Sequence, residues 1–221
     1  MIRIKILFIL AIISIIDGPP SVQGQIQPVP PRVIFNSYIK NYKLKYTLPR
    51  GFAEADTITE SYILPFVKKP TPFNRTHVNV YNKSFSNDSN VMIIWELAHV
   101  SKQTEINARK IFPDADNSRH HIYLIRGLVG ANQCIRGDSL IFDEDDILFY
   151  DKNVLKRLGA EVAGEYTIRL TDPYFDYTHL TLRFVVIPYT LNIYTYIFYK
   201  VYSEELKKEI SKKTRYMMKF R

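Results

Sequence analysis

The stretch Val91–Val100, VMIIWELAHV, decides how the chain folds. Its first five residues are apolar without interruption and end in the only tryptophan of the sequence, Trp95. A short apolar run that is rich in β-branched and aromatic residues is typical of a buried strand. We therefore predict a central strand here and expect Trp95 to lie in the structural core.

Strand patterns recur outward from this stretch in both directions. The composition favours them, because Tyr and Phe together number 29 and Gly only 8. We predict further strands at 33–48, 57–67, 121–128, 133–142, 147–150, 166–171 and 180–187. Capping residues indicate short helices at 101–112, 151–159 and 203–213, the last one basic and amphipathic. Asp143–Asp146 forms an acidic turn, which we favour over a calcium site because no EF-hand pattern is present.

The N-terminus has the pattern of an export signal. Arg3 and Lys5 precede an apolar run over 6–16, which is too short to span a bilayer, and small residues suit cleavage after Gly24. Residues 1–24 are therefore expected to be removed, and the mature chain to be secreted. Three N-x-Ser/Thr sites follow within 16 residues, at Asn74, Asn82 and Asn87, and we expect glycans there.

The net charge of +8 is distributed unevenly along the chain. Residues 200–221 contribute +5, whereas the body at 25–199 contributes only +2. Because a nearly neutral body lacks the electrostatic footprint of a nucleic-acid-binding protein, we expect no nucleic-acid partner. The basic C-terminal region leaves contact with a membrane open.

Cysteine and histidine give no signal for a metal or cofactor. Cys134 is the sole cysteine, so no intrachain disulfide forms, and either burial or pairing with another chain is open to it. His120 and His121 are the only adjacent histidines, and neighbours on a strand point to opposite faces. No HExxH or GxSxG pattern is found. We therefore expect no metal, no cofactor and no catalytic residue.

The segment Ala163-Gly164-Glu165-Tyr166-Thr167-Ile168 resembles the F-strand signature of immunoglobulin-like domains. The resemblance implies that Tyr166 closes a corner by hydrogen bonding to the backbone, that Ile168 replaces the second disulfide cysteine, and that Trp95 is the strand C tryptophan. Neither disulfide position is a cysteine, and the 71 residues between Trp95 and Tyr166 imply an insertion around 101–119.

The resulting fold prediction is all-β: an immunoglobulin-like antiparallel β-sandwich at 76–199, with short helical insertions and a C-terminal helix. Residues 25–75 form an N-terminal extension with edge strands, and residues 200–221 form the basic amphipathic helix or tail. Trp95, Tyr166 and Ile168 are the expected structural core residues. Residues 184–199 lack charge, so we weigh a membrane span against strands and favour strands because polar and apolar residues alternate there.

Arg136-Gly137-Asp138 resembles the integrin-binding tripeptide and is the only candidate binding motif. An Arg and an Asp at the tip of a tight loop suit a metal site on a receptor, although Gly-Asp is also a common turn pair. The sequence predicts a secreted, glycosylated, non-enzymatic binding or adhesion module for an extracellular protein or glycan. Two alternatives stay open: a type I membrane-anchored surface glycoprotein with its span near 184–199, and a secreted hydrolase.

Overall fold

The computed structural model describes residues 31–54, 80–86, 88–99, 101–110, 113–114, 116–133 and 142–221. The export signal, the strand expected at 57–67, Asn74, Asn87, Cys134 and the Arg136-Gly137-Asp138 motif lie outside these residues. They stay predictions.

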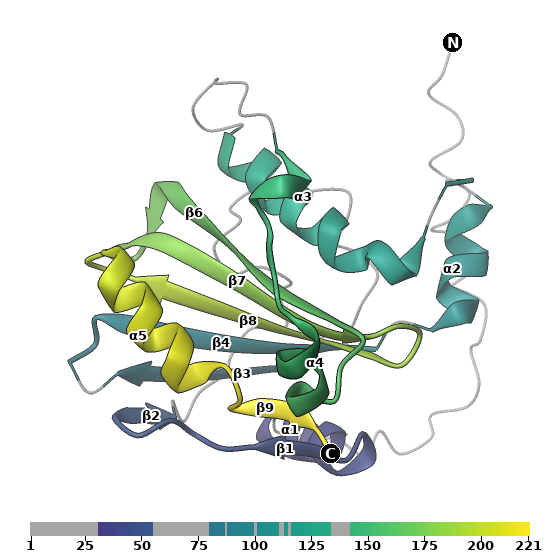
Figure 1. Cartoon of the computed structure of the whole chain (residues 1–221), viewed down its shortest axis with the longest axis horizontal. Coiled ribbons are helices and arrows are strands. Elements are labelled where there is room, and N and C mark those ends of the chain that lie inside the picture. Colours follow the sequence, from purple (N-terminus) through teal and green to yellow (C-terminus); the bar gives the residue numbers. More distant parts are fainter. Residues whose placement is uncertain are drawn as a thin grey trace, which may run out of the picture.

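A seven-stranded antiparallel sheet forms the centre of the molecule (Figure 1). Its strand order is β2-β3-β4-β8-β7-β6-β5, so the two edges are different strands and the sheet does not close into a barrel. The bounds are β2 Phe52–Glu54, β3 Val80–Ser86, β4 Val91–Ala98, β5 Leu148–Phe149, β6 Val162–Tyr174, β7 Tyr177–Ile187 and β8 Leu191–Tyr199. The prediction of an antiparallel, sheet-rich protein is confirmed.

Strand β4 is the central strand that its apolar sequence predicted. It pairs with β3 on one side and β8 on the other, and all eight of its residues are buried. Strand β8 is likewise buried along its whole length, and β7 and β8 together hold residues 184–187 and 191–199. The preference for strands in this region is confirmed. Within the described ranges, no helix combines the length and apolarity that crossing a membrane requires.

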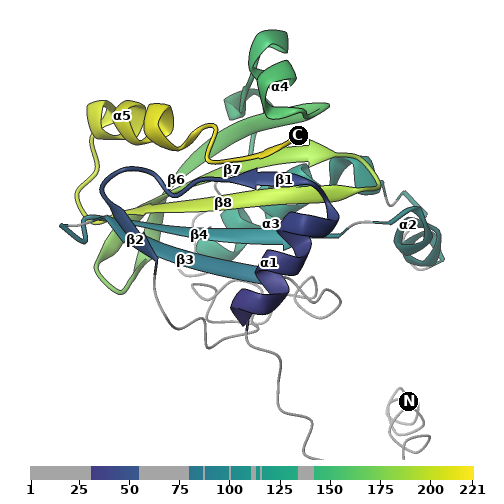
Figure 2. The ribbon, with the colours of Figure 1, turned by 90° about the horizontal axis from the view of Figure 1, so that it is seen from below.

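Each face of the sheet has its own core, because successive side chains of a strand point to opposite faces. The first core contains Trp95 and Ile193, and is covered by helices α1 (Pro31–Asn41), α4 (Lys152–Leu158) and α5 (Glu204–Thr214) with strands β1 (Leu44–Tyr46) and β9 (Met218–Phe220). The second core contains Ile94 and Tyr194, and is covered by α3 (His120–Gln133). Figure 2 shows α1, β1, β9 and α5 together on one side of the sheet.

The short strands β1 and β9 form an antiparallel ribbon that joins the two ends of the described chain. Leu44 pairs with Phe220, and Tyr46 with Met218. These four side chains all contact the first core. The basic C-terminal segment is therefore held against the N-terminal segment rather than projecting from the molecule.

Local signals set the ends of the helices. Asp151 caps α4 by accepting hydrogen bonds from the N–H groups of Asn153 and Val154, and Gly159 ends it in the left-handed conformation. Ser203 caps α5 in the same way through Leu206. Helix α2 (Lys102–Arg109) and the 3-10 turns at Asn117–Arg119 and Glu144–Asp146 complete the elements.

Two predicted strands are wrong. Residues 33–41 of the segment predicted as a strand at 33–48 lie in α1, whereas 44–46 are indeed extended. Residues 121–128 lie in α3, where Ile122, Ile125, Leu128 and Val129 recur at helical spacing and enter the second core. Residues 134–141 of the strand predicted at 133–142 lie outside the described part of the chain.

Trp95 and Tyr166, both expected in the structural core, lie against different faces of the sheet. Trp95 is 1% exposed in the first core, on the face covered by α1 and the β1–β9 ribbon. Tyr166 and Ile168 are only partly buried, and they pack against the second core on the opposite face. The layer that faces Trp95 consists of three helices and a two-stranded ribbon, because the strands expected there are partly helical.

Candidate functional site

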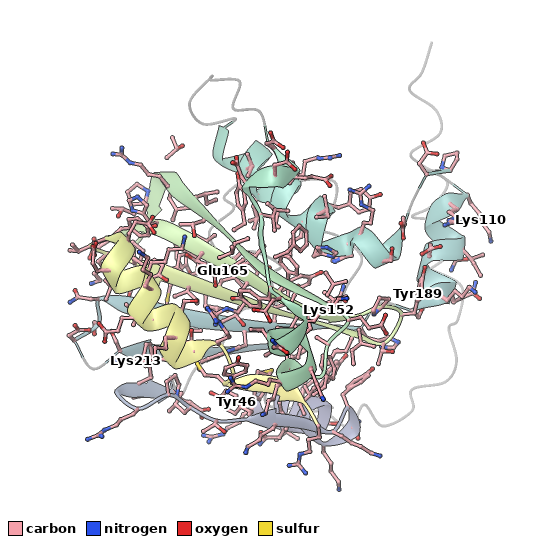
Figure 3. All side chains as sticks on the ribbon, viewed as in Figure 1. Tyr46, Lys110, Lys152, Glu165, Tyr189 and Lys213 are labelled. Atoms are coloured by element: carbon pink, nitrogen blue, oxygen red, sulfur yellow. The ribbon has the colours of Figure 1, made fainter. Side chains whose placement is uncertain are left out.

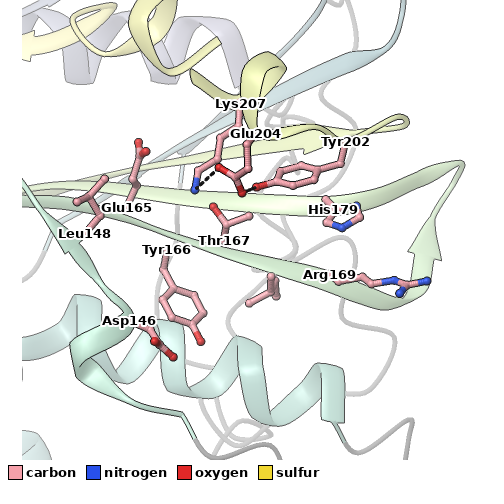
Figure 4. A pocket seen from close by; sticks show the side chains of 11 residues that line it. Asp146, Leu148, Glu165, Tyr166, Thr167, Arg169, His179, Tyr202, Glu204 and Lys207 are labelled. Carbon is pink, nitrogen blue, oxygen red and sulfur yellow. Dashed lines mark hydrogen bonds and ion pairs between the residues drawn. The ribbon is translucent and has the colours of Figure 1, made fainter. Parts of the chain in front are cut away.

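A groove of about 390 Å³ runs along the outer edge of β6 (Figure 4). Strand β5 pairs with β6 only at Leu148–Glu165 and Phe149–Gly164, and β6 borders the groove beyond that point. The groove is lined by Asp146, Leu148, Glu165, Tyr166, Thr167, Ile168, Arg169, His179, Tyr202, Glu204 and Lys207.

The polar groups at the mouth of the groove bond to one another. The Tyr202 hydroxyl donates to Glu204, and the Lys207 ammonium lies 3.9 Å from the same carboxylate. The His179 ring stacks on Tyr202 with the centroids 4.3 Å apart, and its Nδ1 lies 3.0 Å from the Thr178 hydroxyl. Burial and the nearby Arg169 lower the pKa of His179. The Thr178 hydroxyl already donates its proton to the Lys200 carbonyl at 3.1 Å, so it acts as the acceptor toward His179 and is not activated as a nucleophile.

Glu165 connects the groove to a buried ionic network. Its Oε2 lies 3.1 Å from Nη2 of Arg183, and it also accepts hydrogen bonds from Tyr150 and Ser211. Figure 3 labels Glu165. Arg183 donates further to Ser211 and Thr214 of α5. Burial opposes the charge on Glu165, but Arg183 and these hydrogen bonds hold its pKa below the usual value. The network is closed, and it fastens α5 to the sheet.

A second polar cluster lies beneath α3. The Tyr196 hydroxyl donates to Glu96, the Tyr194 hydroxyl lies 2.5 Å from Nδ1 of His120, and Asn192 donates to Tyr194. Burial raises the pKa of Glu96 to about 8, although the bond from Tyr196 lowers it. Glu96, Tyr194 and Tyr196 are at most 3% exposed, so a substrate cannot reach them. Sequence reasoning missed this cluster, because it depends on α3 being a helix.

The residues proposed from the sequence are not brought together in the described structure. Asn82 lies within β3 at the position paired with Trp95; of the other sites, only the acidic turn is described. Asp143 caps that turn, and Glu144 pairs with Arg119 at 2.6 Å and Arg126 at 3.4 Å. Within the described ranges, no group of three His, Cys, Asp or Glu residues is placed to hold a metal ion.

The strongest feature is the difference in charge between the elements that cover one side of the sheet and the rest of the described residues. We define the covering layer as residues 31–50, 151–161 and 203–221, which carry α1, β1, α4, α5 and β9. It contains 15 Lys and Arg but only 5 Asp and Glu, a formal net charge of +10. All other described residues together contain 9 basic and 13 acidic residues, a net charge of −4. Figure 3 marks Lys152 on α4 and Lys213 on α5, both in the covering layer.

The sequence could not show this separation, because the three segments of the layer are far apart along the chain. Pairing of β1 with β9 brings residues 43–46 and 218–221 together. The end of α4 reaches the same place, since Arg157 lies 4.0 Å over the Tyr216 ring. Counted along the sequence, residues 31–50 and 151–161 belong to the nearly neutral body at 25–199, and residues 203–221 belong to the basic C-terminal region.

Comparison with protein-family models, curated proteins and solved structures found no match to this chain. The case for a function therefore rests on the geometry and the charge distribution.

Proposed function

We propose that the protein is an exported, N-glycosylated, non-enzymatic binding module that recognises an anionic extracellular protein or glycan through its covering layer. The observation that carries the proposal is the charge of this layer, +10 against −4 for the other described residues. A surface of one sign attracts partners of the opposite sign over long distances and orients them during encounter.

The layer is suited to recognition because its apolar side chains pack against the first core, which leaves its charged side chains on the outer surface. Phe35, Leu44, Leu158, Ile210 and Phe220 seal it against the first core. Twelve of its 15 basic residues are exposed, and only three make ion pairs with described residues: Arg32, Lys207 and Lys213. Most of the positive charge thus faces solvent and is available to a partner.

The polar residues of the groove support the non-enzymatic part of the proposal. Glu165, His179, Glu204 and Lys207 all interact with other side chains. In the contact between His179 and Thr178 the hydroxyl proton is donated to the Lys200 carbonyl, which does not suit a general base and a nucleophile. An immunoglobulin-like sandwich is not required for this function. The positions of Trp95 and Tyr166 in different cores argue against that finer description.

The test uses the full chain, secreted from a eukaryotic host and added to cultured cells. Binding is measured by flow cytometry at about 0.15 M and 0.5 M salt, because screening at the higher salt weakens charge-driven binding. The test variant is K208E/K212E, on the exposed side of α5. The control is K102E/K110E, at the first residue of α2 and just after its last residue, outside the covering layer, which changes the net charge by the same amount.

We expect the wild type and the control to bind the cells, and binding by K208E/K212E to fall several-fold. High salt should abolish binding by all three proteins. The proposal is overturned if wild-type protein does not bind, or if its binding is insensitive both to salt and to the α5 substitutions. Mass spectrometry of the same material reports the mature N-terminus and the glycans at Asn74, Asn82 and Asn87.

A further inference from the structure

Within the covering layer, six basic residues from three separate segments form a continuous strip across α4, β9 and β1. We define the strip by these residues: Lys43, Lys45, Lys156, Arg157, Lys219 and Arg221. We infer that the strip is the binding site for a linear sulfated polysaccharide. This inference rests on the proposed function and names the ligand class for it.

The backbone fixes the order of the charges along the strip. Lys45 lies directly opposite Lys219 in the β1–β9 register, and the Arg221 N–H donates to the Lys43 carbonyl at 3.2 Å. Leu44 and Phe220 are buried, so Lys45 and Lys219 lie on the other face of the ribbon, toward solvent. The two strands supply Lys45 and Lys219, and Lys43 and Arg221 flank them at one end of the ribbon, which gives four cations in all.

Helix α4 extends the strip beyond β9. A Cβ atom built on Gly159, at the end of this helix, would lie only 3.0 Å from the Cβ of Phe220, which shows how closely the two elements approach. Lys156 and Arg157 occupy the last turn of α4, and both are exposed. The positive charge thus continues across three elements, which suits a chain-like ligand better than a single small anion.

The described part of the chain does not neutralise the strip. Residues 36–53, 152–160 and 210–221 contain no Asp or Glu. None of the six strip residues forms an ion pair with another described residue. Like charges directly opposite one another in a sheet are unfavourable, so the Lys45–Lys219 pair works against the fold. A bound polyanion would remove that repulsion.

The other surface residues favour a polysaccharide over a membrane or a nucleic acid. Among the described residues, the large apolar side chains that are exposed are Val33, Ile106, Leu148, Phe149, Phe175, Tyr189 and Val201, and only Val33 belongs to the covering layer. Basic clusters attract anionic lipid through charge, but an amphipathic element that embeds in a bilayer also inserts apolar residues, and single-stranded nucleic acids are held by stacking of bases on exposed aromatic rings. The covering layer offers neither, whereas its cations suit closely spaced sulfates.

The experiment measures binding of the glycosylated full chain to heparin fragments by isothermal titration in 0.15 M NaCl. Neutral dextran, a DNA duplex and vesicles of anionic phospholipid serve as comparison ligands. The strip variants are K45E and K45E/K156E, and the control is again K102E/K110E. Glutamate at position 45 faces Lys219 and forms an attractive pair, so K45E should fold at least as stably as the wild type.

We expect heparin to bind the wild type, K45E/K156E to bind at least about tenfold more weakly, and the control to stay within about twofold. The slope of the affinity against salt concentration should fall in the strip variant only. If K45E/K156E and K102E/K110E lose heparin affinity to the same extent, the strip is not the binding site. Tighter binding to DNA or to the vesicles than to heparin would overturn the choice of a polysaccharide.

Failure of this inference can be told apart from failure of the proposed function. If cell binding survives digestion of surface glycosaminoglycans but is lost after protease treatment, the partner is an acidic protein. The polysaccharide inference then fails and the proposed function stands. If untreated cells do not bind the protein at all, the proposed function itself fails.

Discussion

Arg183 of β7 and Glu165 of β6 form an ion pair 3.1 Å long beneath α5, with side chains only 2% and 4% exposed. Two residues of the helix, Ser211 and Thr214, complete the hydrogen bonding of this pair. Helix α5 carries a large share of the basic charge, so the buried pair determines where that charge lies. Hydrogen bonds and an ion pair thus hold the proposed binding surface on α5 to the sheet.

Arg183→Met should destabilise the protein by about 3–5 kcal/mol, because it leaves the Glu165 carboxylate buried without its partner. The double variant R183M/E165M should recover a large part of that loss, since it removes both charges. Urea unfolding followed by circular dichroism measures both. Arg119→Met removes an exposed pair with Glu144 and should cost less than about 1 kcal/mol. A loss of similar size in R183M and R119M would contradict this account.

Gly164→Ala should destabilise the protein by about 1–3 kcal/mol. The added methyl group would lie 2.7 Å from the Leu148 carbonyl oxygen and 2.8 Å from Cζ of Phe184. Gly127→Ala on α3 is the matched control, because its methyl group meets nothing within 4 Å and alanine favours a helix, so a gain of about 0.5–1 kcal/mol is expected. Thermal unfolding of the two variants should shift in opposite directions.

Gly164 also shows where the sequence misled. In the segment 163–168 it resembles part of an immunoglobulin signature, but in the structure it lets β5 and Phe184 approach β6. The strands at 91–98 and 180–187 could be predicted because long apolar runs report burial directly. Residues 33–41 and 121–128 could not, because β-branched and aromatic residues suggest a strand while their burial follows a helical period.

The candidate site was harder to predict than the fold. The basic helix at 203–213 and its Ser203 cap are readable from the sequence, and α5 confirms them. The pairing of Lys45 with Lys219 joins residues 174 positions apart and depends on a ribbon of three residues in each strand. A local sequence pattern does not predict a pairing between such distant residues. Counting charges by sequence segment therefore did not indicate the basic surface.

Glu96→Gln should make the protein more stable than the wild type at pH 8, with the difference growing from about pH 5 upward. Burial raises the pKa of Glu96 to about 8, against 4.5 for the ordinary group. The folded state therefore retains a proton that the unfolded state has released, and stability falls as the pH rises through this range. Urea unfolding at four pH values measures the effect. Glu161→Gln, at an exposed site, should run parallel to the wild type.

His121→Phe should protect the protein against acid. His121 is 5% exposed and stacks on Phe184 at 4.6 Å, and burial, with a smaller effect of Arg119, lowers its pKa to about 4. The unfolded state takes up a proton near pH 6.5 and the folded state only near pH 4, so stability is lost as the pH falls between these values. The variant should lack this loss in urea unfolding at pH 4.5 and 6.5.

Lys45→Glu should raise the free energy of unfolding by about 0.2–1 kcal/mol while it weakens polyanion binding. The substitution turns a pair of like charges across the β1–β9 ribbon into a pair of opposite charges, and it leaves the buried Leu44 and Tyr46 side of β1 unchanged. Thermal unfolding at low and high salt measures the gain, which should shrink as salt screens the pair. Lys45→Gln removes the repulsion from Lys219 without adding an attractive partner and should gain less. A destabilised K45E would mean that Lys45 is needed for folding; a gain in stability with loss of heparin binding would mean that it is retained for recognition.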